Sequence, residues 1–162
     1  MSCVLGGCSP GASASWSLIA PPTVSVTDAV IVDDGRVVDG VYWSRVSLAS
    51  GTDDVVFTLS RARFGNACTE WAREMDWPQG CLNDYAVEDQ PSAIVGAHSD
   101  SEVSVASPEG PGENFLVDLE TLKGLLDGDV SVVPPGYEWA QFPFVVTVRD
   151  GLVVAAHQVW VP

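Results

Sequence analysis

The sequence predicts a mainly β domain, built as a small curled antiparallel sheet or a partly open barrel of about seven strands, with two minor helices. Three observations predict this fold class. Short runs of β-branched and aromatic residues recur along the chain, and clusters of Gly, Asp, Asn and Pro separate them. Two segments suit helices. A length of 162 residues corresponds to one domain, so we expect one sheet that curls to protect its edges.

The first three predicted strands lie in the N-terminal part of this domain. Residues 23–32 are rich in Val and Thr and alternate in part, and a turn at residues 33–35 ends them. Residues 41–49 and 54–59 are two further β-branched runs. Because a short glycine-containing loop joins these two runs, they are expected to form a hairpin.

A short helix is predicted over residues 69–76. Thr69 suits the N-cap position, and Glu70 adds a favourable negative charge to the first turn. Pro78 and Gly80 follow the segment and end it.

The middle of the chain predicts two more strands and the second helix. Residues 83–90 are short and mixed in character, whereas residues 93–97 and 102–106 are apolar runs with a period of two, which indicates strands. Residues 115–126 place four leucines at helical spacing, and Asp-Gly follows them as an exit. We expect this helix to bury its leucine face.

The strongest local pattern lies at the C-terminal end. Residues 144–148 and 152–161 are β-branched runs, and the Asp150-Gly151 pair between them is typical of a type I′ hairpin turn. A long proline-containing connection over residues 129–143 leads into this hairpin.

The charge balance excludes several classes of partner. The chain carries 22 carboxylates against seven Lys and Arg residues, a formal net charge of -15. Nucleic-acid binding requires a basic surface that neutralises phosphates, and Arg61 with Arg63 is the closest approach to one. Anionic headgroups also attract Lys and Arg, and no run approaches the roughly 20 apolar residues of a membrane span. Any membrane residence therefore requires a covalent anchor.

The N-terminus suggests such an anchor. Residues 5–8 read Leu-Gly-Gly-Cys and resemble a bacterial lipobox, in which Cys8 would receive the lipid. Residues 9–22 are rich in Ser, Gly, Ala and Pro and predict a flexible tether. A start codon assigned within the apolar region would leave only residues 1–8 of a signal peptide, while the alternative is an ordinary N-terminus with a chance match. The globular domain would then span residues 23–162.

A disulfide between Cys68 and Cys81 is expected in an oxidising compartment. With Cys8 lipidated, these are the two cysteines left in the domain, and 12 residues lie between them. Closing a loop of this length stabilises a fold by roughly 3 kcal/mol. The alternatives are a buried pair of free thiols and a metal site, but neither His98 nor His157 sits at a ligand spacing from them.

Polar residues that could carry chemistry are densest just after Cys81. Asn83, Asp84 and Tyr85 are candidate ligand-binding residues, and carboxylates near Asp84 and Glu88 could act as acid and base in a small hydrolase. The structural alternative is that Asn83 and Asp84 make turn hydrogen bonds while Tyr85 packs into the core.

Aromatic residues offer a second kind of binding surface. Trp139 is the further candidate ligand-binding residue, one of a set that could line a groove for a glycan or a peptide. This set comprises Tyr42, Trp43, Trp77, Tyr137, Trp139 and Trp160. A β domain also needs large residues in its core, which is the alternative role.

Other motifs predict structure rather than chemistry. His98 has Ser99 and Asp100 beside it, but triads assemble from separate elements, so this segment is interpreted as a loop. His157 is interpreted as a surface or half-buried strand residue. Paired aspartates lack the ligand pattern of a calcium loop, and neither a metal nor a cofactor is predicted. These pairs are Asp33 with Asp34, Asp53 with Asp54, and Asp127 with Asp129.

Several short motifs together resemble a group of uncharacterised exported proteins and lipoproteins of high-GC Gram-positive bacteria. They are Asp39-Gly40-Val41-Tyr42, Asp54-Val55-Val56-Phe57, Phe64-Gly65, Asn83-Asp84-Tyr85, Phe144-Val145-Val146-Thr147-Val148-Arg149-Asp150-Gly151 and Gln158-Val159-Trp160-Val161-Pro162. The resemblance covers about residues 39–162. It implies one export-associated domain and supplies no activity.

These observations favour a non-catalytic lipoprotein domain on the outer side of the membrane, anchored through its lipid. Its partner is expected to be a protein or a cell-wall component. The alternative is a small secreted hydrolase that uses Asp84 and Glu88.

Overall fold

The computed structural model describes residues 16–21, 23, 26 and 32–161. Among these residues, seven strands form one sheet in the order β1-β7-β6-β5-β4-β8-β9, and β2 pairs with β3 in a small separate sheet. The protein is mainly β, with 47% strand and 18% helix, as the sequence predicts. The elements are β1 Ser17–Ile19, β2 Val32–Asp33, β3 Arg36–Val37, β4 Gly40–Leu48, β5 Val55–Phe64, α1 Gly65–Glu74, η1 Leu82–Asp84, β6 Tyr85–Ala106, β7 Asn114–Val117, α2 Leu119–Asp127, η2 Val130–Val132, β8 Phe144–Arg149 and β9 Leu152–Gln158.

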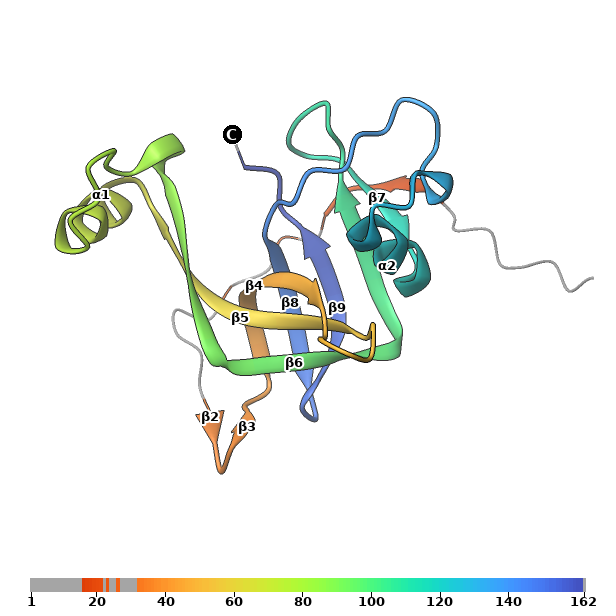
Figure 1. Ribbon diagram of the computed structural model, residues 1–162, viewed down its shortest axis with the longest axis horizontal. Coiled ribbons are helices and arrows are strands. Elements are labelled where there is room, and N and C mark those ends of the chain that lie inside the picture. Colours follow the sequence, from red (N-terminus) through yellow and green to blue (C-terminus); the bar gives the residue numbers. More distant parts are fainter. Residues whose placement is uncertain (1–15, 22, 24–25, 27–31, 162) are drawn as a thin grey trace, which may run out of the picture.

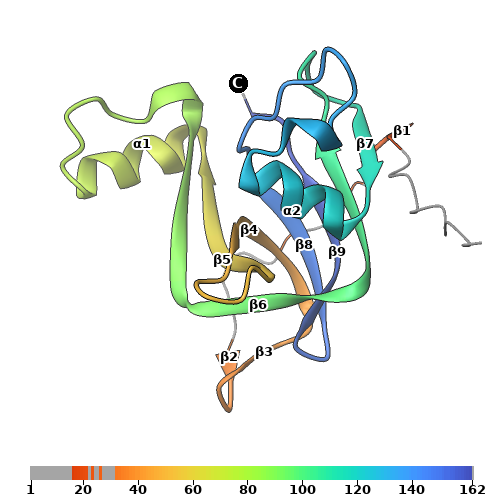
Figure 2. The ribbon, with the colours of Figure 1, turned by 45° about the vertical axis from the view of Figure 1, so that its right-hand side comes forward.

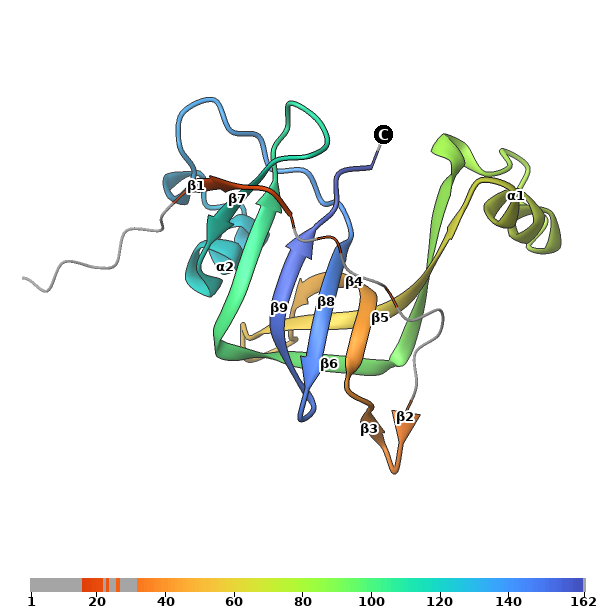
Figure 3. The same ribbon diagram turned by 180° about the vertical axis from the view of Figure 1, so that it is seen from behind.

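Strand β6 curls the sheet into a partial ring. It runs for 22 residues and bends sharply on its way from α1 to β7 (Figure 1). Its first part pairs with β5, from Tyr85 to Gly96, and its last part pairs with both β7 and β9. Strands β9, β8 and β4 lie side by side and are seen from behind in Figure 3. The β6–β9 pairing is parallel, so the sheet is mixed at a place where antiparallel neighbours were expected.

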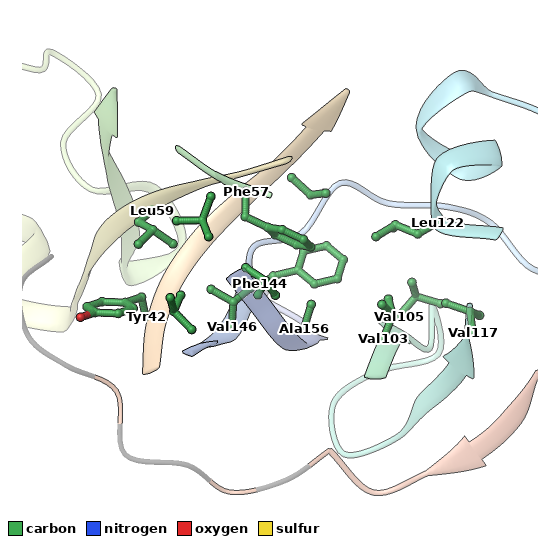
Figure 4. Close-up of a cluster of buried hydrophobic side chains, with 14 of the residues drawn as sticks. Tyr42, Phe57, Leu59, Val103, Val105, Val117, Leu122, Phe144, Val146 and Ala156 are labelled. Carbon is green, nitrogen blue, oxygen red and sulfur yellow. The ribbon is translucent and has the colours of Figure 1, made fainter. Parts of the chain in front are cut away.

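The main core fills the space inside this partial ring. Phe57 of β5 and Phe144 of β8 meet edge to face, with ring centroids 5.9 Å apart, and both are fully buried. Helix α2 lies across the sheet and directs Leu122 into the same cluster (Figures 2 and 4). Leu122 and Leu125 are buried, which confirms the predicted leucine face.

A second, smaller core holds what we call the α1 arm, which comprises residues 60–64 of β5, α1, η1 and residues 85–89 of β6. Figures 1 and 2 both show α1 at the end of the molecule opposite β7. Cys68 and Cys81 form a disulfide that joins α1 to the segment before η1, as predicted. Trp71 and Ala86 pack against this disulfide. The disulfide therefore belongs to a small core of the arm that is separate from the main core.

Both helices begin at residues other than those predicted. Helix α1 starts at Gly65, so Thr69 lies inside it and donates from its hydroxyl to the Gly65 carbonyl instead of capping the helix. Helix α2 starts after Asp118, whose carboxylate accepts from the backbone N–H of Thr121 at 2.7 Å. Residues 114–117, most of which were assigned to that helix, form β7 because they pair with β6.

The folded domain begins earlier than expected. Ser17–Ile19 was placed in the tether but forms β1, which pairs with β7. Trp16 packs between Phe115 and Tyr137, with ring centroids 5.7 Å and 4.8 Å away. The lipobox with Cys8, residues 9–15 of the tether and most of the strand predicted over residues 23–32 lie outside the described residues. Within the described part of the chain, no helix has the length and apolar character needed to cross a bilayer.

Candidate binding site

The predicted ligand-binding residues lie in two places. Asn83 and Asp84 belong to η1 of the α1 arm, and Tyr85 follows as the first residue of β6. Asp84 is exposed and adopts a left-handed backbone with φ of 53°, which is typical of Asp in a tight turn. Trp139 is half-buried and packs against the main core. Tyr85 is therefore the predicted residue around which a site can be built.

The hydroxyl of Tyr85 is shielded from solvent. Of the three tyrosines, Tyr42 donates to the Val38 carbonyl at 2.7 Å and Tyr137 donates to the Ala106 carbonyl at 3.2 Å, whereas the Tyr85 hydroxyl has no hydrogen-bond partner among the described residues. Burial raises the pKa of Tyr85, so the hydroxyl stays protonated and remains a donor. A buried polar group without a partner costs free energy and calls for an explanation.

Tyr85 belongs to a group of three aromatic side chains that we call the aromatic row. Phe64, the last residue of β5, lies between Trp43 of β4 and Tyr85, with ring centroids 5.5 Å and 5.4 Å away. Phe64 and Tyr85 are directly opposed in the β5–β6 pairing. Phe64 is 48% exposed, and the two other rings are half-buried. The row therefore presents aromatic surface to solvent at the junction of the sheet and the α1 arm.

A concave pocket adjoins the Tyr85 end of the row. It has a volume of about 230 Å³, and we call it the Tyr85 pocket. Tyr85, Arg45 and Val46 line it on one side, and the segments before β8 and after β9 complete it. The residues from those segments are Gln141, Phe142, Pro143 and Val161. This mixture of apolar walls and a few polar side chains is the usual composition of a small-ligand site.

A second hollow, of about 240 Å³, adjoins the Trp43 end of the row. Trp43 and Phe64 share it with Arg61 and Arg63, and Val26, Ala62 and Ala67 complete its lining. The row is therefore flanked by concave surface at both ends.

Two ion pairs border the row. Arg45 Nε lies 3.1 Å from Asp89 Oδ1, and Ser60 donates to the same oxygen at 3.1 Å. Arg63 binds Glu88 at 2.6 Å. Burial has the largest effect on the pKa of Tyr85 and raises it, while Arg45, which lines the same pocket as Tyr85, lowers this pKa and Asp89 raises it. The site thus offers planar donors and acceptors, and Arg61, which is exposed at the second hollow, adds a positive charge that has no ion-pair partner among the described residues.

The carboxylates of the hydrolase alternative are placed differently. Glu88 accepts from Arg63, whose guanidinium also lies over the Trp71 ring at 5.1 Å. Asp84 is exposed, and neither carboxylate lines the Tyr85 pocket. General acid–base catalysis needs a carboxyl group within hydrogen-bond reach of a bound substrate, and this arrangement positions Glu88 as an ion-pair partner instead.

A buried polar cluster elsewhere has the residue types of a hydrolytic triad. His157 is 7% exposed, which corrects its interpretation as a surface or half-buried residue, and its Nδ1 lies 2.9 Å from Ser104 Oγ. Its Nε2 lies 3.7 Å from Glu102. Ser104 is fully buried and also accepts from Asn114 at 2.9 Å, so a substrate has no route to its hydroxyl. The cluster therefore joins β6, β7 and β9.

The other polar motifs lie in turns, with the exception of residues 98–100, which were interpreted as a loop but belong to strand β6. The backbone N–H of Asp100 donates to Nδ1 of His98, and both residues are exposed at the β6 bend. Asp34 and Asp53 have φ of 44° and 55°, which places them in left-handed turn positions. Among the residues that the structure describes, no group of three or more His, Cys, Asp or Glu side chains is arranged to hold a metal ion.

Comparison with known proteins gives no match: no protein family model, no curated protein and no solved structure is significantly similar to this chain. The site is thus defined by its geometry alone. Sequence reasoning missed Phe64, because β5 was expected to end at Leu59. The alternation of residues 60, 62 and 64 continues that strand and was the available signal. It also missed Arg45, which lies within a predicted strand, because the pocket that Arg45 lines is formed by segments distant in sequence.

Proposed function

We propose that this protein is a non-catalytic binding domain displayed on the outer side of the cell membrane. Its partner is a component of the cell wall or an envelope protein, and the aromatic row is the binding surface. The observation that carries this proposal is the exposed Phe64 ring, held between Trp43 and Tyr85 beside a concave pocket. Exposed aromatic side chains next to a pocket are a frequent feature of recognition sites.

The proposal includes a lipid anchor on Cys8. Eight residue steps separate Cys8 from Trp16, and an extended chain of this length reaches about 27 Å. Strand β1 lies at one end of the molecule and α1 at the other (Figure 1). A lipid on Cys8 would therefore keep the β1 end near the membrane and direct the α1 arm and its aromatic row outward.

Two observations support binding over hydrolysis. Glu88 is engaged by Arg63, and the Tyr85 pocket is lined by an arginine, an amide and aromatic or aliphatic side chains. Such a lining can hold a ligand by stacking and hydrogen bonding.

Binding to envelope material tests this function. The purified protein is incubated separately with isolated cell-wall material and with solubilised envelope proteins, and the bound fraction is measured. We expect Phe64→Ala to abolish most of the binding. Ile94→Ala is the matched control, because Ile94 is 57% exposed and lies outside the row. Equal binding by wild type and Phe64→Ala would contradict the proposed surface.

The anchor has a separate test. Wild-type protein expressed with a complete signal sequence should partition into the detergent phase, and Cys8→Ser should move it to the aqueous phase. Partitioning that does not depend on Cys8 would rule out lipidation at this residue.

A further inference from the structure

The aromatic row differs from the other aromatic cluster of the domain in its exposure to solvent. Trp16, Phe115 and Tyr137 pack against one another, and the indole N–H of Trp16 donates to the Val132 carbonyl at 3.2 Å. That cluster attaches β1 to the domain. Phe64 is 48% exposed although it lies between Trp43 and Tyr85, so the row has surface left over for a ligand.

We infer that the ligand of the aromatic row is an uncharged glycan chain, an inference that rests on the proposed binding function. The C–H-bearing face of a pyranose ring is apolar and weakly positive, and it packs on the negative face of an aromatic ring. Successive rings lie 5.5 Å and 5.4 Å apart with their planes tilted by 52° and 40°, so the exposed Phe64 ring is the main stacking face of the row. One sugar of a chain can therefore stack on Phe64, and its neighbours extend toward the hollows at the two ends of the row.

The polar border of the row suits sugar hydroxyls. Every hydroxyl both donates and accepts hydrogen bonds, so a sugar is best bound where donors and acceptors stand side by side. Arg45 and Asp89 are such a pair, 3.1 Å apart beside Tyr85, and Gln141 adds an amide to the pocket wall. The volume of about 230 Å³ is of the order of one monosaccharide.

Charge decides which glycans fit. The formal net charge of -15 repels polyanionic chains over distances longer than a hydrogen bond. Near the row, Arg45 and Arg63 are paired with Asp89 and Glu88, and Arg61 at the second hollow has no ion-pair partner among the described residues, so this one unpaired arginine offsets little of that repulsion. An uncharged glycan chain is not subject to this electrostatic repulsion.

The size of the row also favours a glycan over a folded protein partner. A stable protein–protein interface buries about 1,200–2,000 Å², with a well-packed apolar centre. Phe64 is exposed to about one half, and its two neighbours are half-buried, which limits the aromatic area that a flat partner can cover. A narrow chain can lie on Phe64 and also enter the hollows at the two ends of the row, so a larger fraction of its surface is in contact with the protein.

Calorimetric titration with defined oligosaccharides tests the inference. The probes are β-1,4-linked hexasaccharides of N-acetylglucosamine and of glucose, and a proline-rich peptide serves as the comparison because such peptides also bind aromatic grooves. We expect binding of at least one hexasaccharide. Phe64→Ala should weaken it about tenfold or more, the effect of losing one stacked ring. Trp43→Leu should weaken it similarly, and Ile94→Ala should leave it unchanged.

The outcomes separate this inference from the function on which it rests. If neither hexasaccharide binds but the peptide does, and Phe64→Ala abolishes peptide binding, the row is a binding surface and the glycan inference is wrong. If both hexasaccharides and the peptide fail to bind, and envelope material binds equally to wild type and Phe64→Ala, the inference and the proposed function both fail. Circular dichroism spectra of the variants that match wild type establish that each substitution leaves the fold intact.

Discussion

Removing the hydroxyl of Tyr85 should make this protein more stable. In Tyr85→Phe the ring that contacts Phe64 is kept, and a shielded hydroxyl that has no partner within the described part of the chain is lost. Leaving such a group buried costs about 1–3 kcal/mol. We therefore expect the free energy of unfolding to rise by about 1 kcal/mol, which corresponds to an increase in Tm of about 2–4 °C for a chain of this size.

The two other tyrosines provide matched controls for the same chemical change. The hydroxyls of Tyr42 and Tyr137 donate to the carbonyls of Val38 and Ala106. Their replacement by Phe removes a hydrogen bond, so each variant should lose about 0.5–1.5 kcal/mol. The free energy of unfolding should thus rise in Tyr85→Phe and fall in the two controls, although each variant loses a single oxygen atom.

Urea unfolding followed by tryptophan fluorescence measures these differences, provided that the denaturant dependence is the same in all variants. A loss of stability in Tyr85→Phe as large as in the two controls would refute the reasoning. It would mean that a buried water or another group satisfies the Tyr85 hydroxyl in solution. A gain in stability would indicate that the free protein bears a cost at its binding site.

The remaining predictions concern the core, the disulfide and the buried histidine. Leu122→Ala should lower the free energy of unfolding by about 2–5 kcal/mol, because Leu122 is fully buried under α2; a loss below about 1 kcal/mol in urea denaturation would contradict this packing. Replacing Cys68 and Cys81 together by Ser should cost about 3 kcal/mol, and equal midpoints for both proteins would exclude a stabilising disulfide. Burial lowers the pKa of His157, so the unfolded state takes up a proton first and stability should fall as pH decreases below about 6.5. Stability curves between pH 7.5 and pH 5.5, at about these limits, should be flatter for His157→Gln, and parallel curves would assign the effect to other groups.

The features that the sequence predicts best are those whose causes are local. Asp150 and Gly151 have φ of 51° and 76°, the left-handed values that the turn between β8 and β9 requires. The disulfide follows from cysteine number and spacing, and the leucine face of α2 follows from helical periodicity. Each of these signals lies within about 15 residues of sequence.

The features that the sequence missed depend on distant partners. Strand β6 continues through residues 85–106 because β5, β7 and β9 pair with different parts of it, and its own sequence contains turn-like residues at 98–100. The Tyr85 pocket combines Arg45, Tyr85, Phe142 and Val161, which come from four segments. Tyr85 was predicted as a ligand-binding residue from its polar neighbours in sequence. The pocket beside it could not be predicted, because it forms only when these four distant segments come together in the fold.

The docking of β1 has a mechanical consequence for a protein held by a lipid on Cys8. Tension on the chain would reach Trp16 before it reaches the three residue pairs between β1 and β7. Trp16 is fixed by its indole hydrogen bond to Val132 and by two aromatic contacts, so these contacts would have to break before β1 separates from β7. Loss of these contacts and of the β1–β7 pairing would free residues 16–19 and lengthen the tether by about 13 Å. The N-terminal end of the sheet can therefore yield a short extension under load while the core under α2 stays folded.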